Sequence, residues 1–269
     1  MHARMMAVDL EKDALDALSG AIASQLLVTP PNAARHAAIS TRLLLRARQS
    51  ALAHRDFVTL RREGRVYAPV SDGVRSYTLR NGKGVRIDLL QLDPHASLNW
   101  PTGVVAQEVL VISGTLNEGQ GNAMALHSLC IRRDAAQPLI SGSEGARLYV
   151  RQLMEPEDVP EIERAWWFSD AATSTSHWEA LSEGVELQHL RLVGNVTSSL
   201  SRITPGSHVG DHGHNLDEDC MMLQGDLFLG DILLRPDDYQ VAPAGHNHVN
   251  SMSDTGALFY FHGHLPTAI

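Results

Sequence analysis

Hydrophobic residues follow two different spacings along the chain, and the change comes near residue 60. Before that point, apolar residues recur every three or four positions, which places them on one face of an amphipathic helix. This pattern predicts one helix over residues 8 to about 28 and a second from Pro31 to about His54, with a break at Pro30 and Pro31. Two helices cannot form a stable domain on their own. We therefore expect them to dock on the rest of the chain, on a second subunit or on a partner.

From residue 65 onward, short alternating or apolar runs are interrupted by Gly, Pro, Asn and Asp, which is typical of antiparallel β-structure. A shift of 111 residues aligns 67–154 with 178–265 without a gap. The identities fall mostly at turn glycines, prolines and apolar strand positions, which are the residues that a shared backbone requires. The sequence thus predicts a duplicated β-domain. Matched pairs include Gly73 and Gly184, Leu79 and Leu190, Arg80 and Arg191, Pro94 and Pro205, Gly114 and Gly225, Gly145 and Gly256, and Tyr149 and Tyr260.

The repeat divides the chain into four predicted segments. The linker between the two copies is acidic and contains proline, and we expect its aromatic residues Trp166, Trp167 and Phe168 to anchor it to a barrel surface. The segments are a helical segment at 1–60, a first β-domain at 65–154, the linker at 155–177 and a second β-domain at 178–269.

Composition limits the classes of protein to consider. Of the 269 residues, 43% are hydrophobic and 20% charged, which is ordinary for a globular protein and excludes a disordered chain. The net charge of -9 argues against direct binding of nucleic acid, which requires a basic face. The second predicted helix is rich in arginine, and we interpret this first as a solvated face.

Cysteine usage and the N-terminus indicate the compartment. Cys130 and Cys220 lie far apart in sequence and predict neither a disulfide framework nor a thiolate zinc site. The N-terminus has no signal-peptide pattern, and no stretch reaches the roughly 18 apolar residues of a membrane span. We therefore expect a cytoplasmic protein that is neither exported nor embedded in a membrane.

Histidine is the residue that departs most from expectation. The chain has 14 histidines, and seven of them lie between positions 208 and 264. His212 and His214 are two residues apart, so their side chains share one face of a strand, and Glu218 has the same parity. Two imidazoles and a carboxylate form a ligand set that zinc and other first-row metals prefer, whereas calcium and magnesium require more oxygen ligands.

A second pair of histidines offers a fourth ligand. Pro243 and Gly245 predict a tight turn that delivers His246 or His248 on the following strand. His246 has the opposite parity, which favours a place at the pocket rim but leaves it as an alternative to His248. The remaining histidines of this region are interpreted as surface or packing residues; they are His208, His262 and His264.

These positions resemble the two sequence motifs of the cupin family. The resemblance implies a mainly β fold in which two tandem cupin barrels, double-stranded β-helices of the jelly-roll type, follow a short α-helical segment. Two positions depart from the second motif, because Asp237 stands where a glycine is expected and Met252 where an asparagine is expected. The matching positions are Gly206, His212, His214, Glu218 and Gly225 in the first motif and Pro243, Gly245 and His248 in the second.

The cupin resemblance also implies one divalent metal ion inside the second barrel. We favour zinc, with iron, nickel or manganese as alternatives. The implied ligands are His212, His214, Glu218 and His248. Under the 111-residue shift, the same positions of the first copy are Pro101, Gly103, Gln107 and Gln137, none of which matches the metal donors. We therefore expect a single metal-binding barrel.

The residues that follow Glu218 are expected to pack inside the second barrel or between the two barrels. Cys220 and Met222 share the parity of Glu218 and are expected to line the pocket or the core. Met221 and Leu223 point the other way and predict packing of one barrel on the other. In the first copy, Glu108 and His95 are interpreted as packing or solvent-facing residues.

The whole layout resembles the ChrR-like anti-sigma factors. The resemblance is carried by VTPPNAARHAAISTRLLLRAR, followed by the two copies that open with SDGVRSYTL and SEGVELQHL. It implies an N-terminal helical domain that binds an extracytoplasmic-function (ECF) sigma factor and a zinc-binding cupin that responds to oxidative signals. The family's helical domain has a histidine three residues before a CxxC pair; residues 1–60 contain no cysteine, so they resemble a truncated anti-sigma domain.

Three functions remain open. In the first, the helices bind a sigma factor or another protein partner, and the metal barrel senses an oxidative or small-molecule signal. In the second, an iron cupin cleaves a small aromatic or ketone substrate with dioxygen, although the sequence offers no recognisable general base. The third is a binding-only protein with structural zinc. A small-molecule ligand in the second barrel and a homodimer are both compatible with the sequence.

Overall fold

The computed structural model describes residues 33–118, 121–123, 125–133, 138–155, 164–167 and 177–265. Contacts divide the chain into two compact units, 1–54 and 55–269. In the first unit, the structure confirms the second predicted helix as α2 (Ala33–Ala53). The first predicted helix, over residues 8 to 28, lies outside the described residues. Among the described residues, no helix combines the length and the apolar character that a membrane crossing requires.

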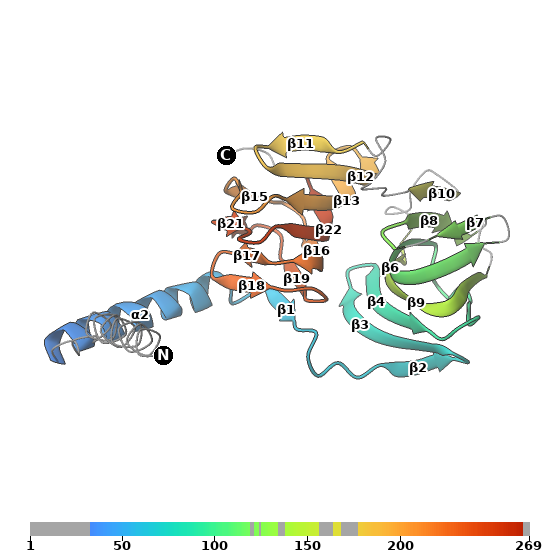
Figure 1. Ribbon diagram of the computed structural model, residues 1–269, viewed down its shortest axis with the longest axis horizontal. Helices are drawn as coiled ribbons and strands as arrows, with labels where there is room; N and C mark the ends of the chain where they lie inside the picture. The colour runs from blue at the N-terminus through green and yellow to red at the C-terminus, as the bar shows by residue number, and fades with distance from the viewer. Residues whose placement is uncertain are drawn as a thin grey trace, which may run out of the picture. The chain divides into compact units, whose positions relative to one another are not determined.

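The first β-domain is one strongly curved sheet with the strand order β10-β8-β6-β9-β4-β3-β2, in which β5 also pairs with β9 and β7 with β6 (Figure 1). Its interior is filled by a cluster of buried aliphatic side chains that includes Val109, Leu129, Leu148 and Val150. The strands are β2 (Ala68–Ser71), β3 (Val74–Gly82), β4 (Val85–Leu92), β5 (Ser97–Leu98), β6 (Ala106–Glu118), β7 (Gly121–Ala123), β8 (Ser128–Arg132), β9 (Leu139–Leu153) and β10 (Arg164–Trp167).

The second β-domain consists of a main sheet in the order β1-β19-β16-β22-β13-β12-β11, a smaller sheet in the order β14-β21-β17-β18, and the pair β15-β20 (Figure 1). Its strands are β1 (Val58–Leu60), β11 (Glu179–Ser182), β12 (Val185–Val193), β13 (Val196–Ile203), β14 (His208–Val209), β15 (His212–Gly213), β16 (Glu218–Gly225), β17 (Leu227–Leu229), β18 (Ile232–Leu234), β19 (Tyr239–Ala242), β20 (Asn247–His248), β21 (Ser251–Met252) and β22 (Ala257–His264).

The 111-residue repeat is confirmed strand by strand. The bounds of β2, β3, β4, β5 and β7, shifted by 111, are those of β11, β12, β13, β14 and β18. Even an irregularity is repeated: the β3–β4 ladder shifts register between Thr78 and Arg80, and the β12–β13 ladder between His189 and Arg191. The fold is therefore mainly β, with two related barrels, as the sequence predicts.

In both barrels, a pair of matched glycines lies where two backbone segments approach each other closely. Gly225 has φ 76°, and a Cβ added there would lie 1.8 Å from the carbonyl oxygen of Gly256. Its counterpart Gly114 has φ 78°, and a Cβ there would lie 2.2 Å from the carbonyl oxygen of Gly145. Any side chain would clash with backbone at these points, so the repeated glycines reflect a shared geometry.

Two short strands extend the sheets beyond the repeated segments. β1 lies within the predicted helical segment 1–60, yet it pairs with β19 at the edge of the second barrel. β10 lies within the predicted linker 155–177 and pairs with β8 of the first barrel. Trp166 and Trp167 belong to β10, whereas Phe168 lies outside the described residues. The four predicted segment boundaries stay predictions.

The barrels pack on each other through a shared apolar cluster. It combines Leu89 and Tyr149 of the first barrel with Leu200 and Met221 of the second, and Leu223 packs against it partly buried. The predicted role of Met221 and Leu223 in packing between barrels is confirmed. This interface holds the two barrels together as one unit and fixes the outer face of β16, the strand that begins at Glu218.

Candidate metal centre

Two short strands bring the first pair of predicted ligands together. His212 on β15 lies directly opposite His248 on β20 in an antiparallel ladder, which puts both side chains on the same face. Their ring centroids are 5.3 Å apart, and both side chains are buried. The turn from Pro243 to Gly245 precedes β20, in agreement with the sequence prediction that this turn delivers a histidine to the site.

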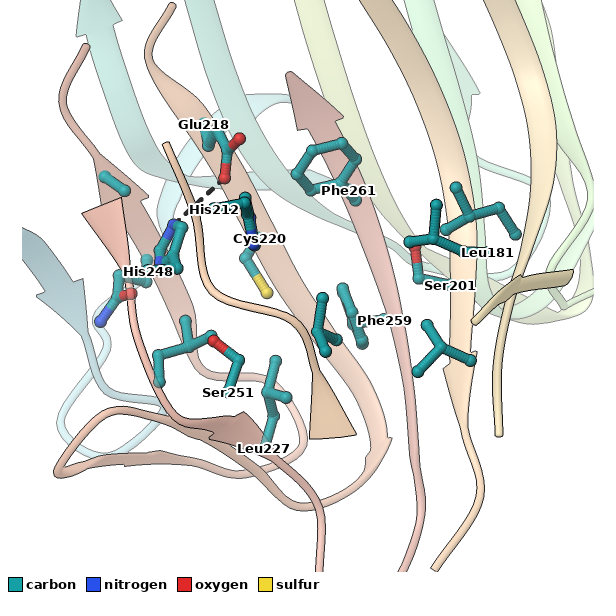
Figure 2. Close-up of a pocket in the computed structure, with 16 residues that line it drawn as sticks. Leu181, Ser201, His212, Glu218, Cys220, Leu227, His248, Ser251, Phe259 and Phe261 are labelled. Atoms are coloured by element: carbon teal, nitrogen blue, oxygen red, sulfur yellow. Dashed lines mark ion pairs between the residues drawn. The ribbon is translucent and has the colours of Figure 1, made fainter. Parts of the chain in front are cut away.

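Glu218 is the first residue of β16 and points to the same place. Its Oε2 lies 3.1 Å from Nε2 of His248, and the ligand atoms of His212, Glu218 and His248 all lie within 4.8 Å of one another (Figure 2). Space for the glutamate is provided by Gly263 on β22, where an added Cβ would lie 2.8 Å from Cγ of Glu218. No sequence pattern singles out Gly263, because its role depends on a neighbouring strand.

His214 lies beside this three-residue group but outside it. Its ring stacks on that of His248 with centroids 5.2 Å apart, and its side chain is buried. Among the described residues, neither Nε2 of His214 nor Oε1 of Glu218 has a hydrogen-bond partner, although both atoms are buried. Buried polar atoms without partners are costly. Their presence fits a site that offers its remaining lone pairs to a cation.

Backbone carbonyls orient two of the imidazoles. Nδ1 of His212 donates to the carbonyl of Gly210 at 2.9 Å, and Nδ1 of His214 donates to that of Leu216 at 2.7 Å. With the proton on Nδ1, each ring presents an unprotonated Nε2, which is the form that binds metal. The local chain therefore selects both the orientation and the tautomer.

Burial also shifts the acid-base equilibria of the cluster. It raises the pKa of Glu218 to about 7, although His214 and His212 oppose the shift. Burial lowers the pKa of His214 below its ordinary value, which keeps that ring neutral. A cation bound here would compensate the buried carboxylate. Neutral imidazole nitrogens and one carboxylate are donors suited to zinc or iron, so the residues present fit a divalent transition metal.

A small apolar cavity of about 60 Å³ adjoins the cluster. Figure 2 shows Glu218, His212 and His248 on one side of it and Phe259, Phe261 and Leu181 on the other. Cys220 lines the cavity, as the sequence predicts, and Met222 is buried in the barrel core. The cavity confines any ligand near the cluster to a few atoms with apolar character.

His246 lies at the rim of the site, as its parity indicates. Its Nδ1 donates to the carbonyl of Pro243 at 3.2 Å, and its Nε2 lies 3.4 Å from a carboxylate oxygen of Asp56. Phe57 contacts the rings of both His246 and His248 edge-on, with centroid distances of 5.5 and 5.6 Å. Asp56 and Phe57 were missed in the sequence because they lie about 190 positions away from these histidines.

The departure from the second motif at Asp237 has a backbone explanation. Asp237 has φ 72°, a left-handed conformation that glycine adopts freely and aspartate tolerates better than most residues. The turn at this position is thus kept with a different residue. At Met252, the second departure, the chain forms the strand β21.

Among the described residues of the first barrel there is no comparable cluster. Gln107, which matches Glu218, is buried, and Gln137, which matches His248, lies outside the described residues. Within the described ranges, one group of His, Cys, Asp or Glu side chains has three members close enough to share an ion. It consists of His212, Glu218 and His248. Glu108 is buried in ion pairs between the barrels, beside His262, which accounts for both residues without a metal.

Comparisons with known proteins identify a matching domain family and similar folds. Residues 170–268 match the family model of the ChrR cupin-like domain. No match was found among the curated proteins. Among solved structures, the chain resembles a candidate dioxygenase from Nostoc punctiforme, with 16% identity and a TM-score of 0.57 over 79% of this chain and 87% of that chain.

Two further solved structures are similar in fold. Ylba from E. coli shows 14% identity and a TM-score of 0.61 over 79% of this chain and 93% of that chain. A mutant of oxalate decarboxylase from Bacillus subtilis shows 13% identity and a TM-score of 0.52 over 78% of both chains. At these identities the similarity establishes the fold alone.

Proposed function

Because the chain has the cupin fold and residues 170–268 match the ChrR cupin-like domain, we propose that it is a metal-binding regulator of a protein partner. The second barrel holds one divalent ion, with zinc favoured over iron, nickel or manganese. The partner is an ECF sigma factor or a similar protein, bound in the cytoplasm by the N-terminal helical segment. The proposed ligands are His212, His214, Glu218 and His248.

The observation that carries this proposal is the packing of Phe57 on the histidines. Helix α2 ends at Ala53, and four residues later Phe57 contacts the rings of His246 and His248. Asp56 adds a polar contact with His246. A change in the position of His248 on metal binding therefore acts directly on the chain that leads into the helix.

The strand that follows Phe57 is suited to such a response. β1 has three residues, Val58 to Leu60, and pairs only at the edge of the main sheet, along β19. Its attachment is completed by Arg61, which donates to a carboxylate oxygen of Asp238 at 2.8 Å. So short an edge strand opens at a lower free-energy cost than the central strands. The metal centre and β19 thus hold a segment that can be released.

The surface of α2 suits a protein partner. Leu43 and Leu44 are 62% and 71% exposed, and α2 contains arginines but no acidic residue. An amphipathic helix of this kind binds a groove that combines apolar contacts with acidic side chains. A sigma factor with an acidic helical surface would provide such a groove.

A bound zinc ion would supply a Lewis-acid centre and hold its ligands in one fixed geometry. The chain's own residues provide the rest. Gly210 and Leu216 orient two imidazoles through their carbonyls, Gly263 leaves room for Glu218, and apolar side chains line the cavity beside the cluster. A small molecule that enters the cavity and carries a donor atom would reach an open position of such an ion.

The cavity also favours a second candidate function, that of a metal-dependent dioxygenase with iron in the same site. An apolar space beside a metal with open positions can admit dioxygen and a substrate fragment. Its volume of about 60 Å³ is below the several hundred Å³ that a pocket for an aromatic substrate needs. We therefore place the enzymatic function second.

Metal analysis and partner binding test the proposal together. We expect full-length protein purified without added metal to contain one equivalent of zinc and to co-purify with an ECF sigma factor. Removal of the metal by a chelator should change the affinity for that partner. Binding to no sigma factor in either state would overturn the regulatory role. Iron together with substrate-dependent oxygen uptake would replace it with the enzymatic one.

A further inference from the structure

We propose that Arg80, in the barrel without metal donors, is a positioning residue for the metal centre of the other barrel. It acts through Asp217 and Asp219, the two residues that flank the ligand Glu218. The inference rests on the proposed metal-binding function, and it gives the first barrel a defined role in that function.

Arg80 holds both flanking carboxylates at once. Its Nη1 donates to Oδ1 of Asp219 at 2.9 Å, and its Nη2 donates to Oδ2 of Asp217 at 2.5 Å. All three side chains are mostly buried, with exposed fractions of 16%, 1% and 12% for Arg80, Asp219 and Asp217. Charged hydrogen bonds in such surroundings are strong and directional. They fix the start of β16, and with it the backbone of Glu218.

Asp217 extends this restraint to the other ligand segments. Its Oδ1 accepts a hydrogen bond from the backbone N–H of Ala244 at 3.0 Å. The next residue, Gly245, donates its N–H to the carbonyl of His214 at 2.8 Å, and the same turn leads into β20 with His248. A single carboxylate held from the first barrel therefore connects three segments that carry proposed ligands.

The repeat separates this contact from ordinary packing between the barrels. Arg191, the counterpart of Arg80, binds Glu108, the counterpart of Asp219. Both arginines follow the repeated register shift, and such bulges re-aim the side chains beside them. The position equivalent to Asp217 is Ala106, which cannot repeat the second contact. The additional contact thus occurs only on the barrel that carries the metal donors.

A second ion pair between the barrels provides a matched control. Arg147 on β9 donates to a carboxylate oxygen of Asp237 at 2.7 Å. The pair also joins the two barrels, but Asp237 is not adjacent in sequence to any proposed ligand. If Arg80 served only to hold the barrels together, removal of either arginine would have the same effect on metal binding.

The test uses the full-length protein, stripped of metal and titrated with Co²⁺ and with Zn²⁺. We expect R80M and D217N to weaken metal binding about tenfold and to shift the visible absorption bands of bound Co²⁺, because residues that orient ligands typically change affinity by this order. R147M should bind both metals as the wild type does. R80K, which keeps the charge but loses the planar fork, should restore part of the affinity.

Circular dichroism and urea unfolding establish that each variant is folded. If R80M does not fold, D217N decides, since it preserves Arg80 and changes a single oxygen. Wild-type affinity in both variants would overturn the inference, and so would an equal loss in R80M and R147M. Failure of the wild type itself to bind metal would instead overturn the proposed function, and the inference with it.

Discussion

Arg191 of the second barrel forms an ion pair with Glu108 of the first, and this pair is the counterpart of Arg80 with Asp219, with the roles of the barrels exchanged. Each arginine follows the same register shift in its own copy. Reciprocal contacts of this kind characterise two-fold symmetric dimers. The tandem chain has thus kept a dimer-like interface inside one polypeptide. The same interface joins two barrels, of which the second carries the proposed metal donors.

The buried pair of Arg191 and Glu108 makes the free energy of unfolding depend on pH in the acidic range. Burial opposes ionisation of Glu108, but Arg191 and Arg151 outweigh it and lower its pKa from 4.5 to about 2. At about 1.4 kcal/mol per pKa unit, the difference corresponds to about 3 kcal/mol of folding free energy. Because the folded-state pKa is the lower one, this stabilisation is present above pH 4.5 and is lost as the pH falls from 4.5 towards 2.

Urea unfolding of the wild type and of E108Q at pH 7 and pH 3 tests this. E108Q leaves Arg191 without its counter-charge and should be less stable by about 3 kcal/mol at pH 7. The gap between the two proteins should narrow at pH 3, since the wild-type glutamate is then mostly protonated in the unfolded state but still ionised in the folded state. A gap that does not depend on pH would show that the charge of Glu108 is unimportant.

The ligand assignment predicts which histidines hold the metal. Substitution of His212 and His214 by alanine removes two of the four proposed donors and should abolish metal binding at equimolar metal. His95 lies in the first barrel, outside the cluster, so H95A should retain the metal content of the wild type. The measurement is elemental analysis after gel filtration. Metal retained in the double variant would refute the site.

The sequence predicts the fold and the histidine–glutamate cluster better than it predicts the long-range contacts that hold the cluster in place. The 111-residue repeat and the two hydrophobic periodicities can be read directly along the chain. They therefore predict the two barrels, α2 and the shared face of His212 and Glu218. Contacts such as Arg80 with Asp217 join positions 137 residues apart, and no spacing rule links them. The matched arginines and carboxylates of the two copies were visible in the alignment, but their pairing across the interface required the structure.

Asp237 illustrates the opposite case, in which the sequence shows a mismatch that the structure resolves. Asp237 stands where the second cupin motif has a glycine. Its φ of 72° shows that the turn is unchanged, because aspartate is among the residues that adopt this conformation at modest cost. A motif position of this kind requires a backbone conformation rather than one residue type.

Gly263 gives a prediction about space beside a ligand. A methyl group there would lie 2.8 Å from Cγ of Glu218 and 3.0 Å from Cζ of Phe261, so G263A should displace the glutamate. We expect a loss of about 1–3 kcal/mol of stability from overpacking, together with weaker metal binding. G142A is the control, because an added Cβ there is also crowded, 2.0 Å from Oγ1 of Thr115, but lies in the barrel without the proposed metal donors. Calorimetric titration with Zn²⁺ measures the affinity of both variants, and urea unfolding measures their stability. Equal affinities for Zn²⁺ would show that the site can adapt.

Phe57 gives the prediction that tests communication between the metal centre and the helical segment. F57A removes the edge contacts with His246 and His248, so the ligand ring loses its outer support and metal should leave several-fold faster. Release of zinc to a colorimetric chelator gives the rate. V66A serves as the control, because Val66 is 82% exposed and its truncation should leave the rate unchanged.

In the wild type, metal should slow hydrogen exchange at the amides of β1, and F57A should abolish that slowing. Protection of β1 that is independent of metal in the wild type would show that the strand does not respond to the site.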